Sequence, residues 1–521
     1  MKKFISHHAG QISGVLSGFD RIRFRGTFRQ LAHVSGMMSI LSYLGVLLKD
    51  FRTLTEDTTA RFREGVEGTA LRAGRPVQYL PSPQTNKEAL VEQVRRQDGV
   101  GPGGVIAVLS AVEVCQSYEI HRNREKKHIE LRPALRKCLH YYVYLQDPMF
   151  GLVHVRMQSW FPFNVHIVVN GREWLARQMD AAHLSYQRAD NCFLWIEDFV
   201  RAQQLADRQR QIDWPKHLER LLRVANPAMR GLIPKARLEP YWSAEQSEWA
   251  TDIAFSSAEH LAGLYPRLIQ HALICFQSRD VMRFLGRKLT PSGKIHPRFQ
   301  GEVVSDLTAR PEGVRIKHRL NRNAVKMYDK QGSVLRVETT INDARDLKVF
   351  RTNEGDTQGK RAYRRLRKGV ADLPRRAQLC QSANRRYLDA LAAADSSTPL
   401  KEFVDVLSRR VEGAGRPARA LNPLGGDAPL LAVIARAEFL IKGFRNADIR
   451  TALFGPDPEH DSKECRRRGA RVCRLIAILR AHGLVKKIPH TQRYLLTAFA
   501  DKCIPAILVA REASLQKLTA A

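Results

Sequence analysis

The chain has no apolar segment long enough to cross a membrane. A spanning helix needs about 18 or more consecutive apolar residues, and the longest apolar stretch, at residues 105–112, has only the length of a strand. The first eleven residues contain two lysines and two histidines and lack the apolar core of a signal peptide. We therefore expect no membrane partner and a cytoplasmic, nucleoid-associated protein.

Metal-binding cysteine patterns and nucleotide-binding motifs are also missing. The eight cysteines form no Cys-x-x-Cys pair and no cluster with histidine, which argues against a structural zinc site and predicts reduced, mostly buried thiols. There is no P-loop, no glycine-rich dinucleotide fingerprint and no Ser-hydrolase elbow. These absences argue against ATP-driven chemistry.

Acidic residues are few compared with basic ones. The 521 residues include 85 Lys and Arg against 52 Asp and Glu, a formal net charge of +33. Neutralising phosphates releases their condensed counterions, so this excess predicts a nucleic-acid partner, with DNA favoured and RNA as the alternative. The content of 44% apolar and 26% charged residues is that of a folded protein.

The chain is too long for one ordinary domain, and we predict an α+β multidomain protein with four parts. The expected parts are a mixed α/β N-terminal domain at residues 1–130, a β-rich central core with inserted helices at 131–345, a basic helical segment and linker at 346–420, and a winged helix-turn-helix domain at 421–521. Strands are expected at 19–26, 105–114, 141–145, 152–157 and 165–169, a helix at 171–182, and mostly helices at 196–290, including 249–255 and a long run at 258–285.

An antiparallel meander is the clearest strand prediction. Residues 314–320, 324–328 and 334–341 are rich in β-branched residues and are joined by short polar connectors. Basic residues alternate with apolar ones along these strands, so one face is expected to pack and the other to be positively charged. The candidate nucleic-acid contacts on that face are Arg315, Lys317, Arg319 and Lys326, followed by Arg336.

A strongly cationic segment and two breaks follow the meander. Residues 355–376 contain eight Lys or Arg against Asp356 and Asp372. Helical residues are expected to continue to Ala394, with a break at 395–399. Residues 409–427 contain six Gly or Pro and are typical of a linker before a last domain.

The last hundred residues have the element order of a winged helix. We expect helices at 430–439, 447–454 and 465–482, then strands at 484–488 and 494–497. Asn446 is the predicted N-cap of the second helix, and Gly483 is placed where the third helix needs a residue with positive φ.

Basic residues are concentrated in this predicted winged helix. Residues 461–493 contain ten basic residues against two acidic ones, more than local ion pairs can balance. A solvated helix face and a protein-docking surface are the alternatives to DNA contact. The candidate DNA contacts are Arg466, Arg467, Arg468, Arg471 and Arg474 on the third helix, facing the major groove, and Lys486, Lys487 and Arg493 on the wing, near phosphates.

Several motifs are distributed over nearly the whole chain. They are GFDRI at 18–22, LHYY at 139–142, WFPF at 160–163, NGREWL at 170–175, FLGRKL at 284–289, KMYDK at 326–330 and LRVETT at 335–340. With these motifs the chain resembles a family of bacterial proteins of about this length that end in a winged helix and whose function is uncertain. This resemblance brings no activity with it.

A second resemblance covers residues 315–341 alone. The KMYDK and LRVE segments are similar to a hairpin of rolling-circle plasmid replication initiators, which nick one DNA strand with a tyrosine and use a bound metal. The resemblance implies Tyr328 as nucleophile and Glu338 as a ligand of Mg²⁺ or Mn²⁺. The His-x-His pair of the usual nicking enzymes is missing, because His154 and His166 lie on two separate predicted strands.

Further metal ligands and simpler roles are open for these residues. Glu248 and Asp252 lie four residues apart in a predicted helix, where both would share one face and could join a metal site. Tyr328 is equally explained as a strand tyrosine with its hydroxyl at the sheet rim. Glu338 is equally explained by a cross-strand pair with Arg336 or Lys326.

Three functions follow from these alternatives. The first is a DNA-binding mobile-element or replication-type factor without catalysis. The second is a metal-dependent tyrosine nicking or transposition enzyme. The third is an RNA-binding protein that partners a structured RNA, for which shape and phosphate contacts suffice.

Overall fold

The computed structural model of the chain describes residues 1–125, 128–287, 289–290, 295–310, 313–352, 359–392, 400–412, 417–436, 439, 443–456, 458, 462–489 and 491–512. The protein is α+β, as predicted, and forms two compact units. Unit 1 consists of Met1–Leu273 and Ser278–Ala392, and unit 2 of Ile274–Gln277 and Ala393–Ala521. This division differs from the four predicted parts, because the expected boundary at residue 130 falls inside a long strand.

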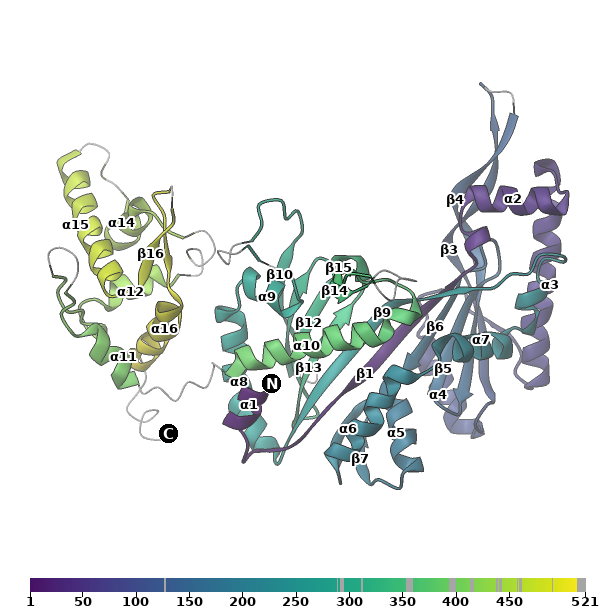
Figure 1. Cartoon of the computed structure of the whole chain (residues 1–521), viewed down its shortest axis with the longest axis horizontal. Coiled ribbons are helices and arrows are strands. Elements are labelled where there is room, and N and C mark those ends of the chain that lie inside the picture. Colours follow the sequence, from purple (N-terminus) through teal and green to yellow (C-terminus); the bar gives the residue numbers. More distant parts are fainter. Residues whose placement is uncertain are drawn as a thin grey trace. The chain divides into compact units, whose positions relative to one another are not determined.

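Unit 1 is built on one eleven-stranded sheet with the order β10-β11-β12-β13-β9-β1-β6-β5-β4-β3-β2. All neighbours are antiparallel except β2 and β3. The N-terminal strand β1 therefore lies in the middle of the sheet, between strands from later in the chain (Figure 1). The sheet strands are β1 (Ile12–Thr27), β2 (Gln78–Tyr79), β3 (Val105–Asn123), β4 (His128–Asp147), β5 (Gly151–Gln158), β6 (Val165–Asn170), β9 (Tyr241–Phe255), β10 (Val303–Arg310), β11 (Gly313–Leu320), β12 (Asn323–Lys330) and β13 (Val334–Ile341).

Helices pack against this sheet on both faces. Phe62 of α3 packs against Tyr141, Trp214 of α7 packs against Phe24, and α10 packs on β9 and β13. Two small hairpins, β7 (Tyr186–Ala189) with β8 (Cys192–Ile196) and β14 (Lys348–Arg351) with β15 (Ala362–Arg365), lie outside the large sheet. The helices are α1 (Lys2–His7), α2 (Val34–Leu44), α3 (Phe51–Arg72), α4 (Lys87–Asp98), α5 (Gly171–Ala181), α6 (Phe199–Asp207), α7 (Trp214–Ala225), α8 (Ala258–Cys275), α9 (Ser278–Phe284) and α10 (Leu373–Leu391).

The predicted meander is confirmed as β11, β12 and β13. Along β11 Ile316, His318 and Leu320 are buried, while Arg315, Lys317 and Arg319 are partly exposed. One face therefore packs and the other is basic, as expected. The prediction that groups Arg336 with these cations is wrong, because every residue of β13 is buried and Arg336 is 0% exposed.

The prediction of helix at residues 249–255 is wrong, since this segment belongs to β9. The strand lies between β1 and β13, and its residues from Ser247 to Phe255 are all buried. A strand covered on both faces does not alternate polar and apolar residues, so the pattern typical of a half-buried strand is missing. The run expected at 258–285 is two helices, α8 and α9.

Two glutamine side chains take the place of a neighbouring strand along β1. β6 ends at Asn170, and beyond it Gln209 Oε1 accepts from the Phe19 amide at 2.9 Å while its Nε2 donates to the Gly171 carbonyl at 2.7 Å. Gln203 makes the same two-sided contact with the Ser17 backbone, at 2.7 and 3.0 Å. Gly171 is required here because a Cβ would lie 2.2 Å from the Phe19 carbonyl oxygen. The backbone next to Asp20 is therefore held rigidly.

Unit 2 has its own apolar core and follows the predicted order of helices and hairpin. Gly483 has φ +70° directly after α15, as expected. Asn446 begins α14 instead of capping it, and its side chain donates to the Gly469 carbonyl and the Cys473 sulfur. The predicted break at 395–399 and parts of the predicted 430–439 helix, the 409–427 linker and the 355–376 segment lie outside the described residues. The elements are α11 (Leu400–Leu407), α12 (Ala428–Ile434), α14 (Asn446–Phe454), α15 (Ser462–Ala481), β16 (Val485–Lys487), β17 (Tyr494–Leu496) and α16 (Ala498–Glu512).

Within the described part of the chain, no single helix has both the length and the apolar composition needed to cross a membrane. The helices Val34–Leu44 and Leu48–Arg72 pass such a test only when taken together, and they are bent by 97°.

Candidate functional site

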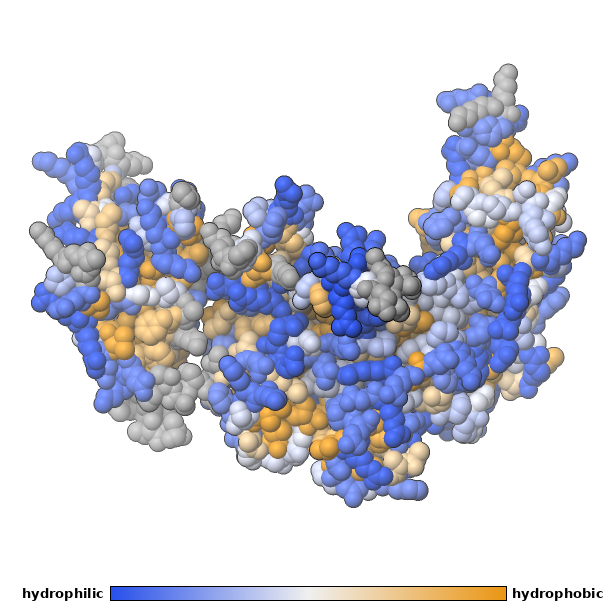
Figure 2. All heavy atoms as spheres, viewed as in Figure 1, coloured by the Kyte–Doolittle hydropathy of each residue, from blue (hydrophilic) through white to orange (hydrophobic). Residues whose placement is uncertain are grey.

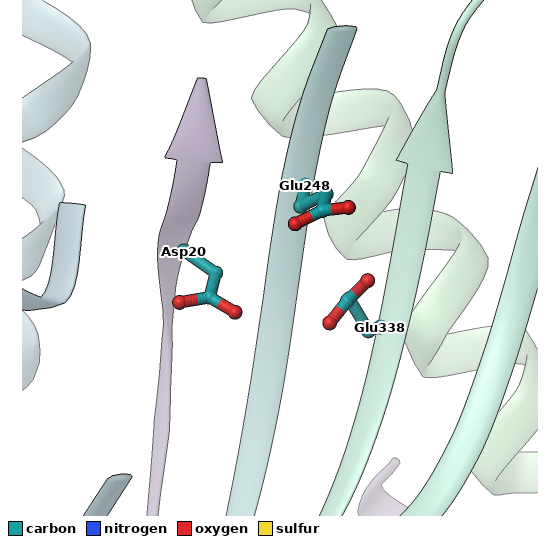
Figure 3. Close-up of side chains that lie close together, drawn as sticks. All are labelled: Asp20, Glu248 and Glu338. Atoms are coloured by element: carbon teal, nitrogen blue, oxygen red, sulfur yellow. The ribbon is translucent and has the colours of Figure 1, made fainter. Parts of the chain in front are cut away.

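Three neighbouring strands of unit 1 bring three carboxylates together. Asp20 lies on β1, Glu248 on β9 and Glu338 on β13, and one oxygen from each lies within 4.8 Å of the others. The three side chains converge from adjacent strands (Figure 3). All three residues are buried, with 4%, 7% and 3% of their surface exposed. We call these residues the carboxylate cluster.

A β-bulge aims Asp20 into the cluster. Phe19 is opposite Trp249 and Ile22 is opposite Ser247, so Asp20 and Arg21 of β1 face the single residue Glu248 of β9. A bulge of this kind turns one side chain away from the regular alternation of its strand. Asp20 therefore reaches the cluster.

Two basic side chains stand beside the cluster. The Lys326 ammonium lies 2.7 Å from Glu338 Oε1 and 3.7 Å from Glu248 Oε1. Arg21 Nε lies 3.3 Å from Glu248 Oε2, and more than half of its side chain is exposed. The alternative in which Glu338 pairs with Lys326 is thus confirmed, whereas the pair with Arg336 is not formed.

Asp252, expected as a metal ligand, is instead part of a buried ion-pair network. Arg336 Nε lies 2.6 Å from Asp252 Oδ1, and Arg172 lies 2.9 Å from Asp252 Oδ2. Both arginines are 0% exposed. Arg336 also donates to Asp20 Oδ2 at 3.2 Å, so the network orients one carboxylate of the cluster. Two guanidinium groups contact the oxygens of Asp252, which is not part of the carboxylate cluster.

The predicted nucleophile and the predicted ligand are in direct contact. The Tyr328 hydroxyl donates to Glu338 Oε2 at 2.8 Å, and Thr340 donates to Glu338 Oε1 at 3.2 Å. Lys326 and Arg336 face Glu338 and Tyr328, respectively, across the β12–β13 pair. The Tyr328 hydroxyl is therefore hydrogen-bonded to the cluster and does not lie at the rim of the sheet.

Burial and like charges shift the acidities in the cluster. Burial raises the pKa of Asp20, and burial together with the nearby Glu338 raises the pKa of Glu248. Burial alone would raise the pKa of Glu338 too, but Lys326, Arg336 and the hydrogen bond from Tyr328 together outweigh burial and keep that pKa below its usual range. Added positive charge beside the cluster would therefore favour the ionised form of Asp20 and Glu248.

Burial and the charge of Glu338 raise the pKa of Tyr328 well above its ordinary value. The phenol is therefore protonated at neutral pH in the absence of an added cation. A divalent ion bound nearby would favour the phenolate, because it offsets the carboxylate charge.

The carboxylate cluster fits a hard divalent cation. Mg²⁺ binds oxygen ligands at about 2.1 Å in an octahedron, so two of its ligand oxygens are at most about 4.2 Å apart. The 4.8 Å span of the cluster exceeds this by little more than half an ångström, a shift within reach of side-chain adjustment. Asp20, Glu248 and Glu338 would be the protein ligands, with water or phosphate oxygens completing the shell.

A row of cations continues from the cluster across the sheet. Lys317 on β11 is opposite Lys326 on β12, which is opposite Glu338 on β13. Burial lowers the pKa of Lys317, and the charges of Lys326, Arg315 and Arg319 lower it further. Such crowding of positive charge beside the carboxylates is typical of a surface that binds an anion.

The predicted contacts in unit 2 divide into exposed side chains and side chains with structural partners. Arg468 pairs with Glu464 at 3.0 Å and donates to the Phe454 carbonyl, and the half-buried Arg493 donates to the Gly443 carbonyl at 3.0 Å. Arg467 also reaches Glu464, at 2.7 Å, but it is largely exposed. The exposed predicted residues are Arg466, Arg467, Arg471 and Arg474 on α15 and Lys486 and Lys487 on β16.

The two histidines on separate predicted strands do lie on neighbouring strands, β5 and β6. Burial lowers the pKa of His154 to about 4 and that of His166 to about 2. His166 accepts from Arg156 at 3.1 Å. Both are therefore neutral at physiological pH, and neither belongs to the carboxylate cluster.

Sequence reasoning missed Asp20 and Arg172 as members of the site. Both lie in motifs of the chain, GFDRI and NGREWL, to which the sequence assigned no function. The available signal was local: Asp20 and Arg21 are consecutive polar residues in an otherwise alternating strand, which indicates a bulge.

No protein-family model, curated protein or solved structure matches this chain. The two resemblances found in the sequence therefore stay predictions, and the candidate site is argued from its own geometry.

Proposed function

We propose that unit 1 is a metal-dependent DNA-nicking enzyme of the mobile-element or replication type. The observation that carries this proposal is the buried carboxylate cluster with Tyr328 hydrogen-bonded to Glu338. Cations flank it on both sides, with Lys326 and Lys317 toward one edge of the sheet and Arg21 on β1. Carboxylates alone would repel DNA, whereas a metal surrounded by cations attracts a phosphodiester.

In the proposed reaction Tyr328 is the nucleophile. Its Oη forms a bond to phosphorus while one ester P–O bond of the DNA backbone breaks. The phenol proton passes by way of Glu338 Oε2, its hydrogen-bond acceptor, to solvent, and the leaving alkoxide takes up a proton from solvent. The metal would polarise the phosphate and offset the charge that develops on it. The product is a phosphotyrosyl link that retains the energy of the broken ester.

Lys326 has two partners available in this scheme. Without metal, its ammonium compensates Glu338 and Glu248. When the cluster binds a divalent cation, the ammonium is repelled and can turn toward a non-bridging phosphate oxygen. Lys326 would thereby couple metal binding to DNA binding.

Binding of Mn²⁺ to the full chain tests the metal site. We expect one ion to bind in isothermal titration calorimetry, with protons released, because Asp20 and Glu248 have raised pKa values and must ionise to ligate. The affinity for Mn²⁺ should therefore rise with pH and be higher at about pH 8 than at about pH 6. Asp252→Asn is unsuitable as a control because Asp252 lies in the buried network.

The matched control for metal binding is Glu245→Gln. Glu245 lies on β9 near Glu248, is partly exposed and pairs with Arg23 at 3.3 Å. This variant should bind Mn²⁺ like the original chain. Absence of Mn²⁺ binding in the original chain, or equal binding by Glu248→Gln, would contradict the site.

A second candidate function, duplex recognition by unit 2 as a winged helix, has its own support. α15 exposes five arginines, the four predicted ones and Arg480, and the short hairpin that follows adds Lys486 and Lys487. This order of helices and a hairpin, with a cationic third helix, is the arrangement that places a helix in the major groove. Under this proposal unit 2 holds duplex DNA while unit 1 acts on it.

Charge reversal on α15 tests this second candidate. We expect Arg467→Glu with Arg471→Glu in the full chain to weaken duplex binding by at least about tenfold and to lower its dependence on salt, since fewer phosphates are neutralised. Arg480→Glu, an exposed arginine at the other end of α15, is the control and should change binding much less. If Arg480→Glu weakened binding as much as the double variant does, α15 would act through its total charge alone.

A further inference from the structure

The β14–β15 hairpin exposes two aromatic side chains side by side. Phe350 is directly opposite Tyr363, and their ring centroids are 5.3 Å apart. Phe350 is 59% exposed and Tyr363 is 55% exposed. Large aromatic groups are normally buried when nothing binds them, so an exposed pair is typical of a contact surface.

Cations frame this aromatic pair. The neighbouring pair of the hairpin on the same face is Lys348 opposite Arg365, and Arg361 precedes β15; all three are exposed. Residues 347–352 and 359–371 contain no acidic side chain. Hydrophilic side chains gather over β14 and β15 in the space-filling view (Figure 2). We call Lys348, Phe350, Arg361, Tyr363 and Arg365 the hairpin platform.

The platform is held firmly by the core of unit 1. Leu347 and Leu366, which flank the hairpin, are buried in the main core, and the Leu366 amide donates to the Leu347 carbonyl at 2.9 Å. Exposure of the aromatic pair is therefore not the result of a loosely attached segment.

A cationic cavity adjoins the base of the hairpin. It is lined by three arginines, Arg351, Arg367 and Arg375, by one carboxylate, Asp372, and by Thr352, Gly369 and Ala371. Arg375 is paired with Asp372 at 2.6 Å, which holds the guanidinium at the cavity wall. Three arginines against one carboxylate leave the lining with net positive charge, which favours an anion such as a phosphate group.

The hairpin base is joined to the strand that supplies Glu248. The Ala244 amide donates to the Lys368 carbonyl at 2.8 Å, and Ser243 forms a bridge with Gly369. Ser243 precedes Glu248 by five residues, about 16 Å along a strand at ~3.3 Å per residue. The base of the hairpin is therefore attached to the same strand that carries Glu248, about 16 Å along it.

We propose that the hairpin platform binds single-stranded DNA. Unpaired bases would stack on Phe350 and Tyr363, while the phosphates contact Lys348, Arg361 and Arg365. Bases within a duplex are already stacked and present only their edges, so an aromatic pair of this kind selects unpaired nucleotides. This inference rests on the proposed function of unit 1 as a DNA-processing enzyme and specifies its substrate as an unpaired segment.

Binding of a fluorescent oligothymidylate to the full chain in EDTA tests this inference. Each stacking aromatic contributes roughly 5- to 150-fold to affinity, so Phe350→Ala with Tyr363→Ala should weaken binding by at least about 30-fold. Binding of a blunt duplex should change by less than about threefold. Lys348→Gln with Arg365→Gln should lower the slope of log affinity against log salt by about 1.4, or ~0.7 for each phosphate that is no longer neutralised.

Three controls separate stacking from other effects. Phe350→Tyr with Tyr363→Phe keeps both rings and should retain the affinity. Tyr79→Ala removes another exposed aromatic of unit 1, 56% exposed on β2, and should not change it. Photocrosslinking of an oligonucleotide that contains 5-iodouracil should modify Phe350 or Tyr363, as identified by mass spectrometry.

Retention of oligothymidylate binding by the double alanine variant would overturn the proposal. An equal loss of duplex binding, or a loss confined to an oligouridylate RNA, would overturn it as well. EDTA prevents metal-dependent cleavage, so this experiment reports the platform alone. If the carboxylate cluster binds no metal, the expected stacking effect is unchanged, and the two proposals can fail separately.

Discussion

Replacing Glu338 by glutamine should lower metal-dependent DNA cleavage by roughly 10³-fold or more. The amide keeps the shape of the side chain but removes the charge that ligates the metal. A metal acting as a Lewis acid supplies several kcal/mol of transition-state stabilisation, and each 1.36 kcal/mol corresponds to a factor of about ten in rate. Asp20→Asn and Glu248→Gln should have effects of the same order, because each removes one of three ligands.

The control for cleavage is again Glu245→Gln, whose carboxylate lies on the same strand as Glu248 but outside the cluster. Cleavage is measured as the rate of product formation at saturating Mn²⁺, and binding to DNA is measured in parallel. Removing Glu338 leaves the Lys326 ammonium without its closest partner, so the folded fraction of each variant is checked by thermal unfolding. A Glu338→Gln variant that is folded and cleaves at the original rate would contradict the metal site.

Replacing Tyr328 by phenylalanine should abolish the covalent protein–DNA adduct. The hydroxyl that donates to Glu338 at 2.8 Å is the only atom removed, so the fold and the carboxylate cluster should persist. The phenol must lose its proton in the proposed reaction and its pKa is raised, so the adduct should form faster as the pH rises. Denaturing electrophoresis of labelled DNA reports the adduct directly.

Tyr265→Phe is the control for this substitution. Tyr265 also donates its hydroxyl to a group on the sheet, the Val314 carbonyl, but it lies outside the cluster. It should give the adduct in the original amount. An adduct that persists in Tyr328→Phe would keep the enzyme but assign the nucleophile to another residue.

The sequence predicts the meander well because its information is local. β11, β12 and β13 are consecutive strands joined by short connectors, and each pairs with the next. The register that places Tyr328 near Glu338 therefore follows from this local connection. The basic face of β11 follows from the same alternation. The Tyr328–Glu338 contact is thus within reach of sequence reasoning.

The rest of the site depends on pairing between distant segments. Asp20 meets Glu338 only because β1 and β13 both pair with β9, and no pattern within β1 identifies its neighbours. β9 is covered on both faces and lacks the alternation that marks an exposed strand, so its pattern predicts a helix. In such a helix Asp252 would lie beside Glu248 as a second metal ligand. In the structure Asp252 instead pairs with Arg172 and Arg336, which are far from it in the sequence.

The domain organisation shows the same limit. The first three predicted parts correspond to a single unit because β3 and β4 form one long hairpin across residue 130 and because β1 lies at the centre of the sheet. Composition marks linkers between segments, but it does not show which segments share a sheet.

The most direct test of the proposed nicking activity incubates the original full chain with labelled single-stranded or hairpin DNA. One reaction contains Mn²⁺ and the other EDTA, and the products of both are separated by denaturing electrophoresis. We predict a shorter DNA strand and a covalent protein–DNA adduct in Mn²⁺ and neither in EDTA. DNA that binds the protein in Mn²⁺ but yields no adduct and no cleavage, over a range of sequences, would contradict the proposed activity.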